Sequence, residues 1–376
     1  MEFSLAHPDL TTPAFLVDEA VVSQNCVAMR EKARRSGTGF RPHMKTHKTL
    51  EIARMQLGPE GGPMTVSTLA EAEFYADGGF DDITYAVPVS PDKLRRAVAL
   101  ARRIRRLNLL TDSLEVLRAM EDFHARQGGV FHVFLKVDCG YHRAGVDPES
   151  EQGMRLALAM SSSKAVHFEG LLTHAGHSYH THSVEEILKV AEQETSVLTG
   201  FRDRLAAQGI TGLVRSTGST PTASAPERLA DTDEIRPGNY VFYDAFQAGI
   251  GACTLSQCAV SVLCTVIGSY PRHGHLLVDA GALALSKDPG ADHIDSNCGF
   301  GVVCDVELNR LPLNMKNLSQ EHGRVEGPAE VIARFPAGTR LRIMPNHSCL
   351  TAAMFSEYQI VRDGKIATQW KPVRGW

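Results

Sequence analysis

Thr38-Gly39-Phe40-Arg41-Pro42-His43-Met44-Lys45-Thr46-His47 is the stretch of this 376-residue chain that says most about its fold. Its first seven residues predict a short β-strand, and a few polar residues separate that strand from a helical pattern that begins at Leu50. Lys45 stands where the strand ends. A lysine at such a place points its amine into the pocket that the following loops build. Apolar surroundings lower the pKa of an amine, which can then form a Schiff base with an aldehyde.

Around this stretch, short apolar runs alternate with amphipathic ones from about residue 18 to residue 245, and Asp18 is the expected N-cap of the first helix. The strand candidates are residues 38–44, 64–68, 82–88, 106–111, 130–138, 166–174, 212–217 and 234–242. Eight β-then-α units predict an α/β fold, a (β/α)₈ TIM-type barrel over residues 13–248. An open doubly wound sheet is the alternative, and the absence of a Gly-x-Gly-x-x-Gly after an early strand weakens it.

After about residue 250 the helical rhythm stops. Strands are predicted at residues 258–267, 275–279, 330–334, 340–344 and 358–362, divided by Gly and Pro turns. Residues 286–328 have the composition of long loops. We therefore expect a second, β-rich domain made of residues 249–376 together with residues 1–12.

Composition excludes some functions. A formal charge of -4 and a pI near 6.5 argue against a nucleic-acid or anionic-membrane partner, since both would call for a basic surface. The chain has no signal peptide and no apolar stretch near the length of a membrane span. Its eight cysteines include no Cys-x-x-Cys pair, so a reducing, cytoplasmic setting is expected.

Polar residues follow several of the predicted strands, at the end of a barrel where active sites lie. Small-residue turns and backbone N–H groups after the seventh and eighth strands suit a phosphate. With an aldehyde on Lys45, this chemistry points to pyridoxal phosphate (PLP). Taken singly, Arg143 could be a surface ion-pair residue, His174 a core histidine and residues 216–220 a capped turn; their common location favours one site. The candidates are Lys45, Arg143, His174, Tyr179, Thr217, Gly218, Ser219, Arg236, Gly238 and Asn239.

In order along the chain come Pro-His-Met-Lys-Thr-His (42–47), Leu-Leu-Thr-His-Ala-Gly (171–176), Ser-Thr-Gly-Ser-Thr-Pro-Thr (216–222), Arg-Pro-Gly-Asn-Tyr (236–240) and Pro-Asn-His-Ser-Cys (345–349). This order resembles the eukaryotic-type D-serine dehydratases. They belong with the D-threonine aldolases among the alanine-racemase-like, fold-type III PLP enzymes, and the resemblance covers nearly the whole chain. It implies that Lys45 carries the Schiff base and that Arg143 lies near the phenolic oxygen of the cofactor. It also implies that His174 lies against the cofactor ring and Arg236 near its pyridine nitrogen. The phosphate would be held by Tyr179, Thr217, Gly218, Ser219, Gly238 and Asn239.

His347 and Cys349 are a candidate metal pair. In an extended segment their spacing places both side chains on one side, and imidazole with thiolate suits zinc. A lone His-x-Cys is weak evidence, but the resemblance strengthens it. Dehydratases carry this pair, whereas the aldolases usually have an aspartate at the second position. Cys349 therefore favours zinc and a dehydratase.

The expected function is a PLP- and zinc-dependent D-serine ammonia-lyase that yields pyruvate and ammonia, with D-threonine as a further substrate. Lys45 would take the Cα proton, and zinc would assist loss of the β-hydroxide. The alternatives are a D-threonine aldolase-type lyase, an amino-acid racemase and a non-catalytic PLP carrier, and the β-rich tail argues against the last. A homodimer is expected by resemblance alone.

Overall fold

The computed structural model describes residues 3–5, 7 and 9–376. They divide into two compact units. One comprises the chain up to Val27 together with Asn239–Pro372; the other comprises Ala28–Gly238 and Val373–Trp376. Helix α1 (Glu19–Ser36) begins after Asp18, whose Oδ1 accepts a hydrogen bond from the Val21 N–H at 3.1 Å, as the expected N-cap should. None of the helices found in the described residues is long and apolar enough to cross a membrane.

The second unit contains a parallel sheet of eight strands in the order β3-β10-β9-β8-β7-β6-β5-β4. A parallel bridge between His43 and Thr65 joins the two edges of this order and closes the sheet into a barrel. Each of the eight strands predicted from the sequence is present, and the barrel is confirmed. The strands are β3 (Gly39–Phe40), β4 (Met64–Val66), β5 (Asp82–Tyr85), β6 (Arg106–Thr111), β7 (Phe131–Lys136), β8 (Val166–Leu172), β9 (Val214–Thr217) and β10 (Glu234–Ile235).

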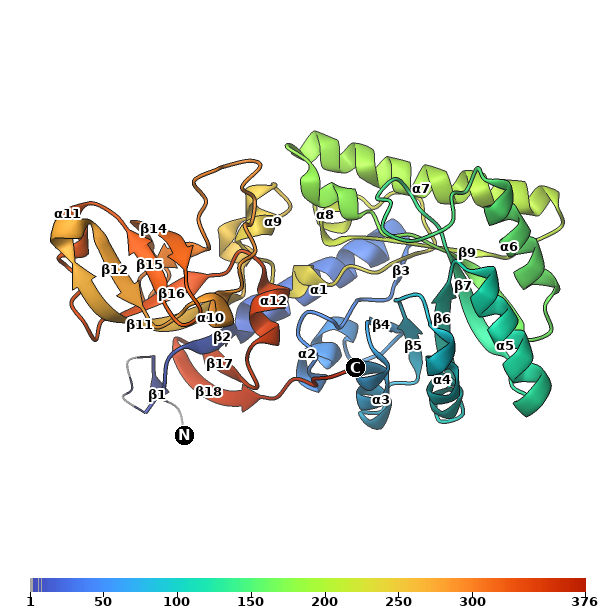
Figure 1. Ribbon diagram of the computed structural model, residues 1–376, viewed down its shortest axis with the longest axis horizontal. Helices are drawn as coiled ribbons and strands as arrows, with labels where there is room; N and C mark the ends of the chain where they lie inside the picture. Colours follow the sequence, from blue (N-terminus) through green and yellow to red (C-terminus); the bar gives the residue numbers. More distant parts are fainter. Residues whose placement is uncertain (1–2, 6, 8) are drawn as a thin grey trace. The chain divides into compact units, whose positions relative to one another are not determined.

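Helices follow the strands and cover the outside of the barrel (Figure 1). One apolar cluster fills the layer between strands and helices, from Val133 and Leu135 of β7 to Leu198 and Phe201 of α7. The helices of this unit are α2 (Leu50–Leu57), α3 (Leu69–Asp77), α4 (Leu94–Ala101), α5 (Leu114–Gln127), α6 (Glu151–Ser162), α7 (Val184–Ala207) and α8 (Thr220–Ser224), with single 3₁₀ turns η1 (Pro91–Lys93) and η2 (Gly176–His180).

A separate set of side chains fills the interior of the barrel. Side chains alternate along a strand, so Val133 and Leu135, which face the helices, imply that the other residues of β7 face inward. Phe134 does so and packs with Leu110 and Leu172 in a separate small cluster. These three side chains fill the middle of the barrel interior. His132 lies on the same inner side toward the amino end of the strand, and Lys136 toward its carboxyl end.

Gly170 of β8 allows β8 and β9 to approach each other closely. A Cβ at this position would lie 2.1 Å from the carbonyl oxygen of Val214 on β9. We therefore expect Gly170→Ala to lower the free energy of unfolding by about 3 kcal/mol, measured by urea denaturation, because strands must separate. Gly200→Ala on α7 is the matched control: nothing lies within 4 Å of its Cβ, and alanine should stabilise the helix by about 0.5–1 kcal/mol. Equal effects at the two glycines would contradict the strand packing described here.

The first unit is β-rich, as expected. Its long strand β11 pairs antiparallel with β2, β12 and β16 within a ten-stranded sheet. The boundary expected at residue 13 differs from the structure, because β2 (Ala14–Asp18) pairs with β11 and β17 and so belongs to this sheet. The other strands are β1 (Phe3–Ser4), β11 (Val260–Tyr270), β12 (His275–Val278), β13 (Val302–Cys304), β14 (Arg310–Leu318), β15 (Gly323–Glu326), β16 (Arg340–Met344), β17 (Tyr358–Arg362) and β18 (Lys365–Trp370).

Two predictions for this unit were wrong. Residues 330–334 form no strand; they lie largely in helix α11 (Ala329–Ile332), which starts directly after Pro328 with its φ of -59°. Residues 286–328 are not only loops, because they contain β13 and the antiparallel pair of β14 and β15. Register shifts interrupt these pairings and obscure the alternation that marks a strand. The short helices of this unit are α9 (Ala245–Gly249), α10 (Ala282–Leu285) and α12 (Ser348–Ala353), with η3 (Asn239–Val241), η4 (Leu255–Gln257) and η5 (Pro271–His273).

Candidate functional site

Lys45 lies in a turn immediately after the bridge that closes the barrel, at the carboxyl ends of the strands. Its side chain is exposed, and its N–H donates to Nδ1 of His43 at 3.3 Å. The loop after β10 packs on this turn: a Cβ on Gly238 would lie 3.0 Å from Cβ of His43. The structure therefore places Gly238 against His43, in the turn that carries Lys45.

Two histidines flank this lysine. Burial, followed by the positive charge of Lys45, holds the pKa of both His43 and His174 well below the usual value for histidine. Both rings are thus neutral near pH 7. His174 follows β8, and its Nδ1 lies 3.3 Å from the carbonyl oxygen of Gly218. A neutral, partly buried imidazole beside an amine provides a flat surface and adds no charge.

Arg236 comes from the end of β10 and is buried. Its Nη1 donates to Oγ of Ser216 at 2.5 Å and to the carbonyl oxygen of Thr217 at 2.9 Å, and its Nη2 donates to the carbonyl oxygen of Thr173. Burial lowers the pKa of Arg236 to about 10, so it is still charged at pH 7. Among the described residues Nε has no such partner, and a guanidinium fixed by its two other nitrogens can offer this N–H to a ligand.

Beneath Arg236, hydrogen bonds continue down the barrel. Ser216 Oγ donates to Glu234 at 2.5 Å, and Arg41 bridges Glu234 and Asp82 at 2.9 and 2.6 Å. Each of these charges is nearly buried and is compensated by the next. The position of Arg236 therefore depends on a chain of buried polar groups.

The turn after β9 is shaped by Gly218. Its φ is +121°, and a Cβ there would lie 2.8 Å from the backbone nitrogen of Arg236. Ser219 follows as N-cap of α8, and its Oγ lies 2.9 Å from Oγ of Ser178 in η2. The first turn of α8 contains no acidic side chain. Hydroxyls and a tight backbone turn at a helix start are chemistry that a phosphate accepts.

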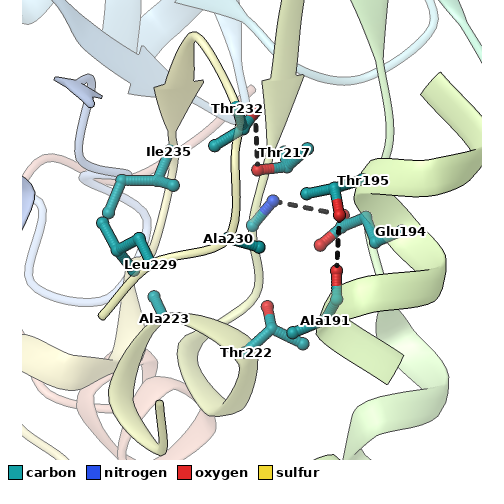
Figure 2. A pocket seen from close by; sticks show the side chains of 11 residues that line it. Ala191, Glu194, Thr195, Thr217, Thr222, Ala223, Leu229, Ala230, Thr232 and Ile235 are labelled. Atoms are coloured by element: carbon teal, nitrogen blue, oxygen red, sulfur yellow. Dashed lines mark hydrogen bonds between the residues drawn. The ribbon is translucent and has the colours of Figure 1, made fainter. Parts of the chain in front are cut away.

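Glu194 of α7 stabilises this turn through hydrogen bonds. Its Oε1 accepts hydrogen bonds from Thr173 Oγ1 at 2.8 Å, from the Ala175 N–H at 3.1 Å and from the Gly218 N–H at 3.1 Å. Figure 2 shows Glu194 on α7 beside Thr195, and Glu194 and Gly218 both line a cavity of about 20 Å³, enough for one water. Thr217 turns its hydroxyl to Thr232 at 3.2 Å. The Gly218 N–H and the Thr217 hydroxyl are thus already engaged within the protein.

Arg143 and Tyr179 lie in the loops that follow β7 and β8. The guanidinium carbon of Arg143 is 5.3 Å from the centre of the Tyr141 ring, and that ring is edge-on to His174 at 6.2 Å. Tyr141 also stacks on His177, both of whose ring nitrogens are buried without a hydrogen-bond partner in the described structure. The structure thus gathers nine of the predicted cofactor residues, all except Asn239, in one unit.

Lys136 was missed by the sequence reasoning. It ends β7 on the inner side of the barrel, is buried, and donates to the carbonyl oxygen of Val137 at 3.1 Å. Burial lowers the pKa of Lys136 to about 8. The signal was a lysine at an inward position of an otherwise apolar strand. Lys45 is therefore not the only lysine at the carboxyl end of the barrel.

The lowered pKa of Lys136 predicts a pH dependence of stability. Between about pH 8 and 10.5 the unfolded chain holds a proton that the folded protein has lost, so the free energy of unfolding rises with pH in this window. Lys136→Met should flatten this rise by about 2 kcal/mol, measured by urea denaturation at pH 7.5 and 10. Lys32, whose pKa burial also lowers to about 8, should maintain a smaller rise in the variant. An unchanged pH dependence would mean that Lys136 titrates normally.

In the other unit, His347 and Cys349 are neighbours, but their segment is not extended as predicted. His347 is the N-cap of helix α12, and Cys349 lies in its first turn. The helix starts here because the carboxylate of Asp244 accepts from the N–H of Ser348 at 2.9 Å. Burial lowers the pKa of His347, but hydrogen bonds with Asp288 and Cys349 outweigh it and raise the pKa to about 11. The two side chains are close enough to share a metal ion.

The sequence did not predict that Asp288 and the side chain of Asn239 lie beside this pair. Asp288 accepts from Nδ1 of His347 at 2.8 Å, which leaves Nε2 for a metal, as carboxylates behind metal-binding histidines do. Asn239 was expected at the phosphate, yet its Nδ2 lies 2.7 Å from Asp244, 2.9 Å from Ser348 Oγ and 3.6 Å from Cys349 Sγ. Its side chain therefore belongs to the surroundings of the metal pair.

Comparisons with known proteins agree with this architecture. Residues 17–245 match the family model of the alanine racemase N-terminal domain, and residues 259–361 match that of a putative serine dehydratase domain. The D-serine dehydratase of Dictyostelium discoideum is 39% identical over 98% of both chains. The D-threo-3-hydroxyaspartate dehydratase of Delftia sp. strain HT23 is 38% identical over 98% of both chains.

Solved structures give the same result. The Delftia enzyme superposes with a TM-score of 0.92 at 36% identity, covering 99% of this chain and 100% of that one. Two variants of a D-threo-3-hydroxyaspartate dehydratase also have TM-scores of 0.92. In one, solved in the metal-free form, a cysteine is replaced by alanine, and in the other a histidine is replaced by alanine. Similarity at this level over the full length of both chains identifies more than a shared fold. The chain belongs to the D-serine dehydratase family of lyases, whose barrel is that of alanine racemase.

Proposed function

We propose that this protein is a PLP- and zinc-dependent dehydratase that converts D-serine to pyruvate and ammonia. The observation that carries the proposal is the group formed by Lys45, His174 and Arg236 at the carboxyl ends of the barrel strands, in a chain 39% identical to a D-serine dehydratase. The group offers an amine, a flat neutral ring and a guanidinium. These match the aldehyde, ring and ring nitrogen of PLP.

The turn that would receive the phosphate also fits. The close approach of Gly218 to Arg236 leaves room only for a residue without a Cβ, and Ser178 and Ser219 bring hydroxyls to the same turn. Tyr179 and Gly238 complete the proposed set, with Asn239 contributing through its backbone alone, because its side chain is engaged elsewhere. When bound, PLP would supply an electron sink that stabilises a carbanion at Cα of the substrate.

Lys45 is the proposed base. Its Nζ would remove the Cα proton of the substrate, and the neutral rings of His43 and His174 would avoid adding positive charge beside the amine. Arg236, held by Ser216 and two carbonyl oxygens, would orient the cofactor ring. Arg143 would lie at the phenolic oxygen. A single base on one face would restrict turnover to one enantiomer, and we propose that this is the D form.

His347 and Cys349 are the proposed zinc ligands. Imidazole and thiolate are donors that zinc favours, and two protein ligands leave positions for water or substrate. In the two D-threo-3-hydroxyaspartate dehydratase variants the replaced histidine and cysteine are two positions apart, as His347 and Cys349 are here. Bound zinc would supply the Lewis acidity that loss of a β-hydroxide requires. Asp288 would hold the imidazole in the orientation that presents Nε2.

Pyruvate release tests the proposal. The purified protein should form pyruvate from D-serine and none from L-serine. D-threonine should give 2-oxobutyrate; glycine and acetaldehyde would instead establish the aldolase. Racemisation of either serine enantiomer would favour the racemase, and no turnover of any substrate would favour a PLP carrier.

D-threo-3-hydroxyaspartate is the second candidate substrate, because the Delftia enzyme is 38% identical, almost as similar as the Dictyostelium enzyme. The ratio of kcat/KM for the two substrates decides between them. We further propose a cytoplasmic homodimer, and sedimentation velocity of the purified protein tests the dimer.

A further inference from the structure

At the end of the barrel opposite Lys45, three side chains with metal-binding atoms lie together: His132, His167 and Glu169. One ligand atom from each lies within 4.8 Å of the others. Nδ1 of His132 is 2.5 Å from Oε1 of Glu169, and Nε2 of His167 is 3.7 Å from the same oxygen. None of these residues takes part in the proposed dehydration.

The strands account for this grouping. His132 on β7 is directly opposite His167 on β8, and their ring centres are 5.1 Å apart. The register shifts just beyond this pair: Val133 faces Phe168, but Phe134 faces Gly170, so Glu169 is an extra residue in β8. Such a bulge redirects a side chain, and here it keeps the carboxylate beside both imidazoles. Rigid strands therefore fix all three groups.

The chemistry of the three groups fits a divalent ion. Two imidazoles and one carboxylate are a common zinc donor set, and tetrahedral ligands at 2.0–2.2 Å lie roughly 3.4 Å from each other. The separations of 2.5 and 3.7 Å between the imidazole nitrogens and Oε1 of Glu169 lie on either side of that value. Arg106 binds the other carboxylate oxygen, Oε2, at 2.7 Å, which orients Glu169 to present Oε1. The positive charge of Arg106 also repels a metal cation. We therefore expect the site to bind a divalent ion less tightly than the same three ligands would without this arginine.

An ion could reach this cluster from solvent. The side chain of Glu169 is only 10% exposed, whereas those of His132 and His167 are 32% and 58% exposed. An ion held here would tie β7 to β8 at the amino ends of the strands. This end of a (β/α)₈ barrel serves stability, while chemistry takes place at the other.

We propose that His132, His167 and Glu169 form a structural site for a divalent ion of the zinc type, separate from the pair His347 and Cys349. The ion takes one ligand atom from each side chain and completes its shell with water. The inference is independent of the proposed function, because it concerns residues outside the dehydratase site.

The test counts bound zinc with and without the other pair. Zinc-free protein is titrated with Zn²⁺, and with Co²⁺ as a visible probe, at pH 8. We expect two equivalents for the wild type, one for His347→Ala/Cys349→Ala and none when His167→Gln is added to that double variant. Zn²⁺ should also raise the Tm of the double variant, and His167→Gln should remove this increase.

His322→Gln is the control, because this histidine is exposed and outside the cluster. It should change nothing. Circular dichroism checks that each variant folds; should His167→Gln unfold, Glu169→Gln repeats the measurement with a side chain of the same size. The proposal is overturned if the double variant binds no zinc, or if its zinc survives both substitutions in the barrel. If the wild type and the double variant each bind one equivalent of zinc, His347 and Cys349 hold none, and the site at His132, His167 and Glu169 is supported.

Discussion

Lys45→Ala should reduce turnover of D-serine at least ~10³-fold and remove the visible absorbance of the bound cofactor, because we propose that this one amine both attaches PLP and moves the Cα proton. The expectation rests on the turn after His43, where Lys45 is exposed between two neutral histidines. Borohydride reduction of the wild type, followed by peptide mapping, should place the cofactor on Lys45. Labelling of Lys136 would overturn the assignment, since its lowered pKa of about 8 makes it the competing amine.

Two further measurements separate chemistry from structure. Added methylamine should restore part of the turnover of Lys45→Ala, because a free amine can act as the missing base; a purely structural lysine would not be replaced in this way. Lys48→Gln is the matched control from the same turn. Lys48 pairs with Glu71 at 2.9 Å, so this variant should lose some stability but keep the cofactor.

The barrel was predictable from the sequence because its longer strands are rich in apolar residues and alternate with helical patterns. β6 and β7 are examples, with inward and outward residues in alternation. The β-rich unit was harder, because its strands depend on partners far away in the chain. β14 has a proline and two asparagines, and only its pairing with β13 and β15 makes it a strand. Residues 330–334 contain a short apolar run of three residues, yet a helix starts there directly after Pro328.

Some residues of the candidate site were likewise predictable from the sequence, and others were not. Residues at strand ends, such as Lys45 and Arg236, could be named because a barrel fixes where strand ends meet. Glu194 could not be named with the same reasoning, although a clue existed. It occupies the buried side of α7 together with Ala191 and Leu198, where a carboxylate needs partners. Those partners, the N–H groups of Ala175 and Gly218, come from two different strand ends and are visible only in three dimensions.

Gly238 and Asn239 are adjacent in the sequence but lie in different surroundings in the structure. Gly238 packs on the turn of Lys45, whereas the Asn239 side chain contacts Asp244 and Ser348. Sequence proximity favoured one role for both residues. The structure separates them because the chain passes from one compact unit to the other between these two positions.

Removal of zinc should stop dehydration of D-serine while leaving the visible absorbance of bound cofactor intact. Hydroxide is a poor leaving group and needs a Lewis acid, whereas proton removal at Cα needs only the base and PLP. Chelation should therefore lower kcat for D-serine by about 10³-fold or more. Turnover of β-chloro-D-alanine should fall far less, because chloride leaves without assistance. The comparison of the two substrates thus isolates the step for which zinc is proposed.

His347→Ala and Cys349→Ala should reproduce the chelated enzyme, because each removes one of the two proposed protein ligands. Asp288→Asn should act more weakly and lower zinc affinity by about 10- to 100-fold, since it disturbs only the 2.8 Å contact that orients His347. Excess zinc should then restore Asp288→Asn but not the two alanine variants. Dehydration of D-serine at an undiminished rate by zinc-free protein would show that the pair has no catalytic role. His347 and Cys349 would then serve only to anchor the start of α12 against the loop that carries Asp288.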